Sequence, residues 1–219
     1  MSHSTTQISV DGGIVEGDLT VPEAARGLVL FAHGSGSSRH SPRNRYVADV
    51  LHEAGLATLL FDRLTVSEER RDMETMEFRF DIGLLAQRLL RATDWVLANE
   101  ALEKLPLGYF GASTGAAAAL VAAAQRPDVA KAIVSRGGRP DLAESSLANV
   151  RAPTLLIVGG YDSQVLALNR DALASLRAEK ELSVVPGATH LFEEPGALEQ
   201  VARLAKEWFL QHLRSGEEQ

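Results

Sequence analysis

Ser113 stands in a stretch whose residue types favour covalent chemistry. Residues 111–115 read Gly-Ala-Ser-Thr-Gly, which has the Gly-x-Ser-x-Gly pattern of a nucleophile elbow. An elbow turns the chain sharply from a strand into a helix, so the serine hydroxyl projects above the sheet edge. The glycines remove side chains that would collide with neighbouring backbone. The helix start presents N–H groups and a positive dipole end that suit a developing oxyanion.

Two residues further along the chain have the chemistry to activate Ser113. Asp162 follows a predicted strand over 154–159, and His190 follows a predicted strand over 182–185. A serine hydroxyl is a poor nucleophile unless a base takes its proton, and His190 is the predicted base. Asp162 would accept the other ring N–H, hold the tautomer and stabilise the imidazolium. These residues predict nucleophilic attack on an acyl carbon.

The order Ser113, Asp162, His190 along the chain is the order that α/β-hydrolases use. The chain therefore resembles the α/β-hydrolase superfamily, and more narrowly its small, lidless, dienelactone-hydrolase-like branch. The resemblance covers nearly the whole chain, although dienelactone hydrolase proper has a cysteine nucleophile where this chain has serine. It implies an oxyanion hole formed by the backbone N–H groups of Thr114 and of Ser35, which lies in a Gly/Ser-rich loop.

Each assignment has a structural alternative. Ser113 could be an ordinary turn serine, and Asp162 could only cap the helix that begins near residue 165. Asp141, after the preceding strand, competes as the acid. His33 is expected to brace its loop rather than transfer protons, and His40 is expected to be an exposed loop residue.

Three arginines, Arg39, Arg63 and Arg136, fall in loops on the predicted catalytic side. One or two of them could hold a substrate carboxylate through bidentate hydrogen bonds. The alternative is a solvated or structural arginine, paired with Asp62 or Asp141.

The elements that must position these residues alternate between strand and helix from about residue 27. This order predicts an α/β fold: a three-layer αβα sandwich with a mostly parallel sheet and antiparallel N-terminal edge strands. We expect one domain over residues 1–219, without a cap domain. Strands are predicted over 7–10, 14–21, 27–32, 56–61, 105–110, 129–135, 154–159 and 182–185, and helices over 42–54, 81–98, 114–126, 142–148, 165–176 and 197–213.

The charged residues 66–80 are predicted to be a solvated connection, partly helical, that borders the strand ends. Such a segment could wall or gate the site.

Composition limits the other function classes. The formal net charge of −7 gives no basic field for nucleic acid or an anionic membrane surface. The absence of cysteine excludes disulfides and thiolate metal sites. No metal-ligand spacing, phosphate loop or dinucleotide-binding spacing occurs, so neither a metal nor a cofactor is predicted. The polar start and the lack of a long apolar run predict a cytoplasmic protein. The sequence sets no oligomeric state and is compatible with a monomer.

The leading functional hypothesis is hydrolysis of small carboxylic esters through an acyl-serine intermediate, with a small-molecule ester as the partner. Thioesters and lactones are close variants, because one elbow and one oxyanion hole serve all three. Acyl transfer or perhydrolysis on the same three residues is an alternative. A ligand-binding protein that keeps the fold without catalysis is another, since fold does not determine function.

Overall fold

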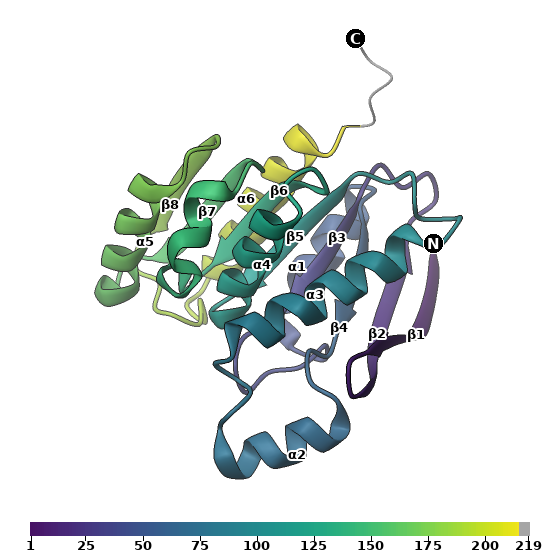
Figure 1. Ribbon diagram of the computed structural model, residues 1–219. Helices are drawn as coiled ribbons and strands as arrows, with labels where there is room; N and C mark the ends of the chain where they lie inside the picture. Colours follow the sequence, from purple (N-terminus) through teal and green to yellow (C-terminus); the bar gives the residue numbers. More distant parts are fainter. Residues whose placement is uncertain (215–219) are drawn as a thin grey trace.

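The computed structural model describes residues 1–214 and contains an eight-stranded sheet with helices on both faces (Figure 1). In the described residues the strands lie in the order β1-β2-β4-β3-β5-β6-β7-β8. The pairs β1–β2 and β2–β4 are antiparallel, and the remaining pairs are parallel. The strands are β1 (Ser2–Val10), β2 (Gly13–Val21), β3 (Leu28–Ala32), β4 (Ala57–Phe61), β5 (Leu107–Ala112), β6 (Ala130–Arg136), β7 (Thr154–Gly159) and β8 (Lys180–Val185).

The helices divide between the two faces of the sheet. Helices α1 (Pro42–Glu53) and α6 (Ala197–His212) pack together on one face. The other face carries α3 (Ile82–Leu97), α4 (Thr114–Gln125), the 3₁₀ segment η1 (Pro140–Asn149) and α5 (Ser163–Ser175). The predicted α/β sandwich with antiparallel N-terminal edge strands is therefore confirmed.

Both faces of the central strands are buried, which explains their uninterrupted apolar sequences. In β3, Leu28, Leu30 and Ala32 pack into the core under α3 and α4, whereas Val29 and Phe31 pack into the core under α1 and α6. On the second side, Phe31 stacks on Phe110 of β5 with ring centroids 4.7 Å apart.

The start of the first strand and the type of one predicted helix need correction. Strand β1 begins at Ser2 rather than near residue 7, because its polar first half pairs in register with β2 as far as Ser2 opposite Val21. The predicted helix over 142–148 is the 3₁₀ segment η1, which is broken at Glu144, where φ is 46°.

Residues 66–80 contain a regular helix, α2 (Val66–Thr75), followed by a non-helical stretch, in agreement with the predicted partly helical connection. A capping box begins the helix, because Thr65 accepts a hydrogen bond from the Glu68 N–H while the Glu68 carboxylate accepts one from the Thr65 N–H. After the helix, the Asp72 carboxylate accepts hydrogen bonds from the N–H groups of Phe78 and Arg79. In Figure 1, α2 stands off from the layered body below the sheet.

Helix α4 begins in close contact with two strands. A Cβ atom at Gly115 would lie 2.0 Å from the carbonyl oxygen of Ala32 in β3, and one at Gly111 would lie 2.4 Å from Cα of Ala116. No side chain fits at either position, so the two glycines allow the strand-to-helix turn that presents Ser113.

We expect Gly115→Ala to destabilise the fold, because the added methyl group meets backbone that cannot rotate away. Overpacking of this kind costs about 1–3 kcal/mol or more, which corresponds to a fall in Tm of about 2–4 °C per kcal/mol. Gly83→Ala is the matched control, since a Cβ at Gly83 in α3 has its nearest contact at 3.4 Å. Thermal unfolding should show a lower Tm for G115A and an unchanged or higher Tm for G83A. Equal Tm values for both variants would contradict the packing argument.

Candidate active site

Ser113 occupies the turn between β5 and α4 with φ 51° and ψ −120°. A non-glycine residue at positive φ costs about 1–3 kcal/mol unless its surroundings hold it. Here the Ser113 N–H donates to the carbonyl of Arg136 at 3.2 Å, and the Ser113 carbonyl accepts from the N–H of Arg139 at 3.1 Å. Although Ser113 is at the N-cap position, its hydroxyl makes no capping hydrogen bond, so the group is not consumed by the helix.

The side chains of His190 and Asp162 are hydrogen-bonded, with Nδ1 of the imidazole 2.6 Å from Oδ2 of the carboxylate. An ionised carboxylate only accepts hydrogen bonds, so Nδ1 carries the proton and Nε2 has the free lone pair. The side chain of Asp162 is 14% exposed and that of His190 is 39% exposed, which leaves the imidazole open to solvent. The other carboxylate oxygen of Asp162 accepts from the Val165 N–H at 3.4 Å, so Asp162 also caps α5.

The loop after β6 joins Ser113 to His190. Arg136, which is the last residue of β6 rather than the loop residue predicted, accepts from the Ser113 N–H, and Arg139 in the following loop donates to the Ser113 carbonyl. Between them, a Cβ atom at Gly137 would lie 3.5 Å from Cε1 of the His190 ring. The structure thus brings Ser113, His190 and Asp162 to one edge of the sheet, as the chain order predicts.

Ser35 and Thr114 also meet at this edge. The Ser35 hydroxyl lies 3.1 Å from the carbonyl of Arg79 and 3.0 Å from the Thr114 hydroxyl. A carbonyl can only accept, so Ser35 donates to Arg79 and Thr114 donates to Ser35. A Cβ atom at Gly34 would lie 3.2 Å from Cβ of Ser113, which places this loop against the elbow.

Asp141 and His33 have structural partners. Asp141 forms two hydrogen bonds with the guanidinium of Arg139, at 2.9 and 2.7 Å, whereas His190 is paired with Asp162. The buried His33 ring lies 3.0 Å from the carbonyl of Gly34 through Nδ1. Burial, with a smaller contribution from the charge of Arg63, lowers the pKa of His33 to about 3. His33 therefore stays neutral at physiological pH and braces its loop.

The three candidate arginines have different environments. Arg39 pairs with the carboxylates of Asp62, Glu16 and Asp18. This is the structural role considered above, and it leaves the guanidinium engaged by protein carboxylates instead of open to a substrate carboxylate. Arg136 is 9% exposed, and burial together with the charge of Arg43 lowers its pKa to about 10.

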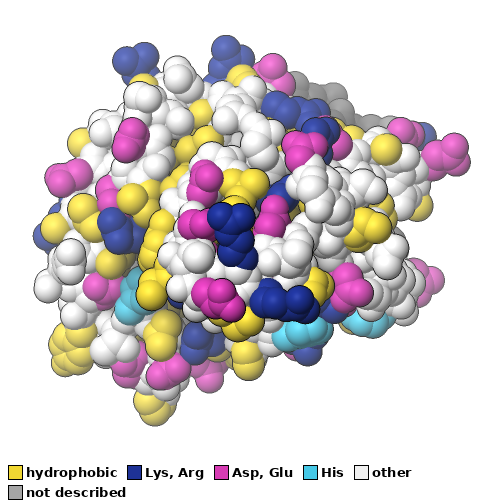
Figure 2. Space-filling view, turned by 60° about the horizontal axis from the view of Figure 1, so that its bottom comes forward, with side chains coloured by type: hydrophobic (Ala, Val, Ile, Leu, Met, Phe, Trp, Pro, Cys, Tyr) yellow, Lys and Arg dark blue, Asp and Glu magenta, His cyan; other side chains and the backbone are white. Residues whose placement is uncertain are grey.

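Arg63 is buried, and no hydrogen bond or ion pair joins its guanidinium to another described side chain. The surface at the α2 end of the molecule carries both acidic and basic side chains (Figure 2).

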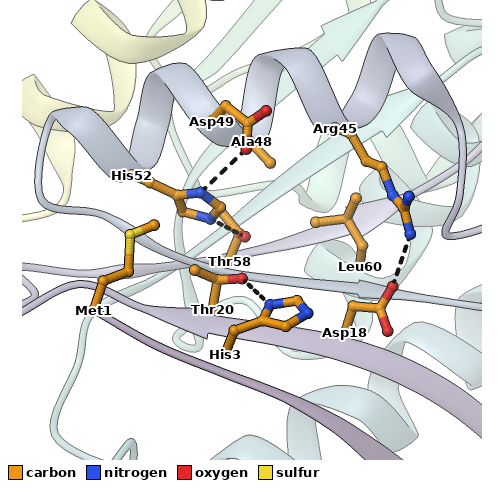
Figure 3. Close-up of a pocket in the computed structure, with 10 residues that line it drawn as sticks. All are labelled: Met1, His3, Asp18, Thr20, Arg45, Ala48, Asp49, His52, Thr58 and Leu60. Atoms are coloured by element: carbon orange, nitrogen blue, oxygen red, sulfur yellow. Dashed lines mark hydrogen bonds and ion pairs between the residues drawn. The ribbon is translucent and has the colours of Figure 1, made fainter.

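A cavity of about 360 Å³ lies between α1 and strands β1, β2 and β4 (Figure 3). None of Ser113, Asp162 and His190 lines this cavity. Its two imidazoles each have a threonine partner: His3 with Thr20 at 2.9 Å, and His52 with Thr58 at 2.7 Å. Within residues 1–214, no group of three or more metal-ligating side chains could hold a metal ion. In the same part of the chain, no helix is long and apolar enough to span a bilayer.

Sequence reasoning missed the contacts that hold the site in place. The clamp of Arg136 and Arg139 on Ser113 uses backbone groups, which leave no side-chain signal. The doublet Gly137-Gly138 after β6 was an available signal of close approach, because a Cβ at Gly138 would lie 2.0 Å from the Ser135 hydroxyl.

The family model of the Dienelactone hydrolase family matches residues 25–213. The chain belongs to the dienelactone hydrolase family. A crystal structure described as dienelactone hydrolase from Anabaena variabilis is 60% identical and superposes with a TM-score of 0.95, over 97% of this chain and 99% of that chain. A lidless α/β serine hydrolase from Xanthomonas campestris, 21% identical over 95% of this chain and 94% of that chain with a TM-score of 0.74, shares the fold.

A longer relative from Mycobacterium tuberculosis is 63% identical over 199 residues, and its name suggests a phosphoribosyl transferase. The match covers 91% of this chain but 44% of that relative. The chain therefore spans less than half the length of the curated relatives that it matches first.

We expect His33 to make stability depend on pH. The folded pKa of about 3 lies below the unfolded value of 6.5, so the unfolded chain binds the extra proton. Stability from this group is complete above pH 6.5 and is lost as the pH falls toward 3.

Within that window the slope is about 1.4 kcal/mol per pH unit. Urea unfolding of His33→Gln between pH 7 and 4 should show a shallower fall in stability than the parent protein. His40→Gln controls for the loss of an imidazole from the surface. An unchanged slope in H33Q would contradict a buried, neutral His33.

Proposed function

We propose that the protein hydrolyses small carboxylic esters through an acyl-enzyme intermediate on Ser113. The observation that carries this proposal is the 2.6 Å hydrogen bond between His190 and Asp162, at the same edge of the sheet as a serine held at positive φ whose hydroxyl makes no capping bond. Membership of a hydrolase family supports the reaction class.

In the proposed mechanism, Nε2 of His190 takes the proton of the Ser113 hydroxyl as its oxygen attacks the carbonyl carbon. The imidazolium, stabilised by Asp162, then protonates the leaving alcohol, and the acyl group remains on Ser113. A water molecule deprotonated by His190 attacks the acyl-serine and releases the acid. The proton returns to Ser113, which restores the starting state.

The backbone N–H groups of Thr114 and Ser35 are the proposed oxyanion donors. Thr114 is the first residue of α4, so its N–H has no acceptor within the helix and lies at the positive end of the dipole. The hydroxyl chain from Thr114 through Ser35 to the Arg79 carbonyl holds the two residues side by side. A donor held in advance is worth about 3 kcal/mol of barrier.

Solvent access favours hydrolysis over acyl transfer. His190 is 39% exposed, so water reaches the base that must activate it. Exposed apolar side chains flank the pair, with Tyr161 next to Asp162 and Leu191 next to His190. These two side chains are the proposed contacts for the apolar parts of small esters, thioesters or lactones. The phosphoribosyl transferase name belongs to relatives that are more than twice as long as this chain.

Ser113→Ala should abolish turnover of short p-nitrophenyl esters and prevent labelling by a fluorophosphonate. His190→Ala should have a comparable effect, and Asp162→Asn should reduce kcat by about 10⁴-fold. Ser145→Ala, an exposed serine in η1, should retain activity and labelling. Measurable turnover by the parent protein that persists in S113A would rule out the proposed nucleophile. A folded parent protein that neither turns over nor becomes labelled would favour a ligand-binding role.

The oxyanion assignment distinguishes the backbone of Ser35 from its side chain. Ser35→Ala keeps the N–H and should lose less than about tenfold in kcat. Ser35→Pro removes the N–H and should lose about 10²–10³-fold. Tm measurements on both variants would separate loss of the donor from loss of the fold. Equal kcat values for the two folded variants would show that the Ser35 N–H does not stabilise the oxyanion.

A further inference from the structure

Arg63 follows strand β4 and is 2% exposed. Among residues 1–214, no carboxylate lies within ion-pair distance of its guanidinium, and its buried Nε and Nη1 atoms have no hydrogen-bond partner. A buried charge without a partner costs several kcal/mol. Burial lowers the pKa of Arg63 only to about 9, so the group remains charged at neutral pH. A buried cation of this kind requires a negative group close to it.

The charged neighbours of Arg63 do not supply that group. Asp62 pairs with Arg39, and Asp72 accepts three hydrogen bonds from residues 78–79. Glu69 of α2 borders the same space, but its side chain is exposed and forms no ion pair with Arg63. His33 is neutral and adds no negative charge.

A small cavity opens beside Arg63. It has a volume of about 70 Å³ and is bounded by Arg63, by residues 33–37 and by side chains from α2 and the segment after it. A second space of about 20 Å³ adjoins Arg63, His33 and Ser37. One water molecule needs roughly 10–15 Å³ of such space. The space therefore admits a group of a few atoms and is too small for a whole ester.

We propose that Arg63 and the loop 34–37 bind one small monovalent anion directly behind the proposed oxyanion donors. The guanidinium supplies the charge and a fork of N–H donors, and Ser37 borders both spaces as a further donor. The anion is either a free ion, such as chloride or formate, or a carboxylate carried by a substrate. The experiments below distinguish these two sources.

Such an anion would stabilise the loop that carries Ser35. The same loop residues that border the cavity include Ser35, whose hydroxyl is bonded to Thr114 and to the Arg79 carbonyl. Binding would therefore hold the loop against Arg63 whether or not Ser113 is a nucleophile. The inference is independent of the proposed catalytic step.

The first test is thermal unfolding of Ser113→Ala, titrated with sodium chloride or sodium formate at constant ionic strength, with sodium sulfate as the balancing salt. A single site predicts a saturable rise in Tm, of about 3–6 °C at an anion concentration ten times Kd. Arg63→Met should remove the saturable rise, and Arg63→Lys should raise Kd at least tenfold. Working in the S113A background keeps this result separate from any failure of catalysis.

Arg88→Met is the matched control, because Arg88 is equally buried but is paired with Glu68 and the Asp11 carbonyl. It should lower Tm equally in every salt and keep the anion-dependent rise. Glu69→Gln tests the competing counterion: binding that appears only in E69Q would show that Glu69 neutralises Arg63 and would overturn the proposal. No saturable rise in the parent protein, or an identical rise in R63M, would overturn it as well.

Kinetics distinguish the two sources. If the site takes a carboxylate from the substrate, chloride should raise KM for an ester that carries a carboxylate and leave KM for a neutral ester unchanged. If a free ion occupies the site, chloride should not compete with either ester, so both KM values should stay unchanged while the rise in Tm persists. Either pattern, together with loss of the Tm rise in R63M, supports the anion site.

Discussion

Helix α4 begins so close to strands β3 and β5 that no side chain fits at Gly111 or Gly115. This close approach forces the chain through a turn in which Ser113 has φ 51°. The strain is held by backbone hydrogen bonds to Arg136 and Arg139, so the loop after β6 becomes part of the same unit. The proposed oxyanion donors, the approach of His190 along Gly137 and the freedom of the serine hydroxyl from helix capping all depend on this arrangement.

Charge at the catalytic edge is distributed unevenly. Several arginines form ion pairs with carboxylates, as Arg39 does with Asp62 and Arg139 does with Asp141. Arg63 and His33 differ, because both are buried and the histidine is neutral beside the cation. The elbow is the basis of the proposed chemistry on an acyl group, whereas the surroundings of Arg63 are the basis of the proposed anion site close to the same loop. The two features share Ser35 and can be tested separately.

Much of the fold could be predicted from the sequence, because buried strands such as 154–159 and amphipathic helices such as 81–98 have clear apolar patterns. Helix α2 has no apolar stripe, so the sequence predicted only a partly helical segment there, although Thr65 and Glu68 have the spacing of the capping box that begins the helix. The first half of β1 is polar and becomes a strand only through pairing with β2. The hydrophobic pattern of a segment does not predict structure that forms only through contacts with another segment.

In the candidate site, too, some features could be predicted from the sequence and others depend on residues far apart in the chain. Chain order and strand ends were enough to predict that Ser113, Asp162 and His190 lie at the same edge of the sheet, and the pairing of His190 with Asp162 is observed. The bond from Ser35 to the Arg79 carbonyl joins residues 44 positions apart and has no local signal. The burial of Arg63 was also unpredictable, since an arginine in a loop is ordinarily exposed.

Acid quenching during turnover of p-nitrophenyl acetate, followed by peptide mass spectrometry, tests the central claim most directly. The account predicts one acetyl group per chain, on the peptide that contains Ser113 and on the serine itself. It also predicts that His190→Ala will not accumulate this species. Turnover without acetylation of Ser113, or with acetylation at another residue, would contradict the account.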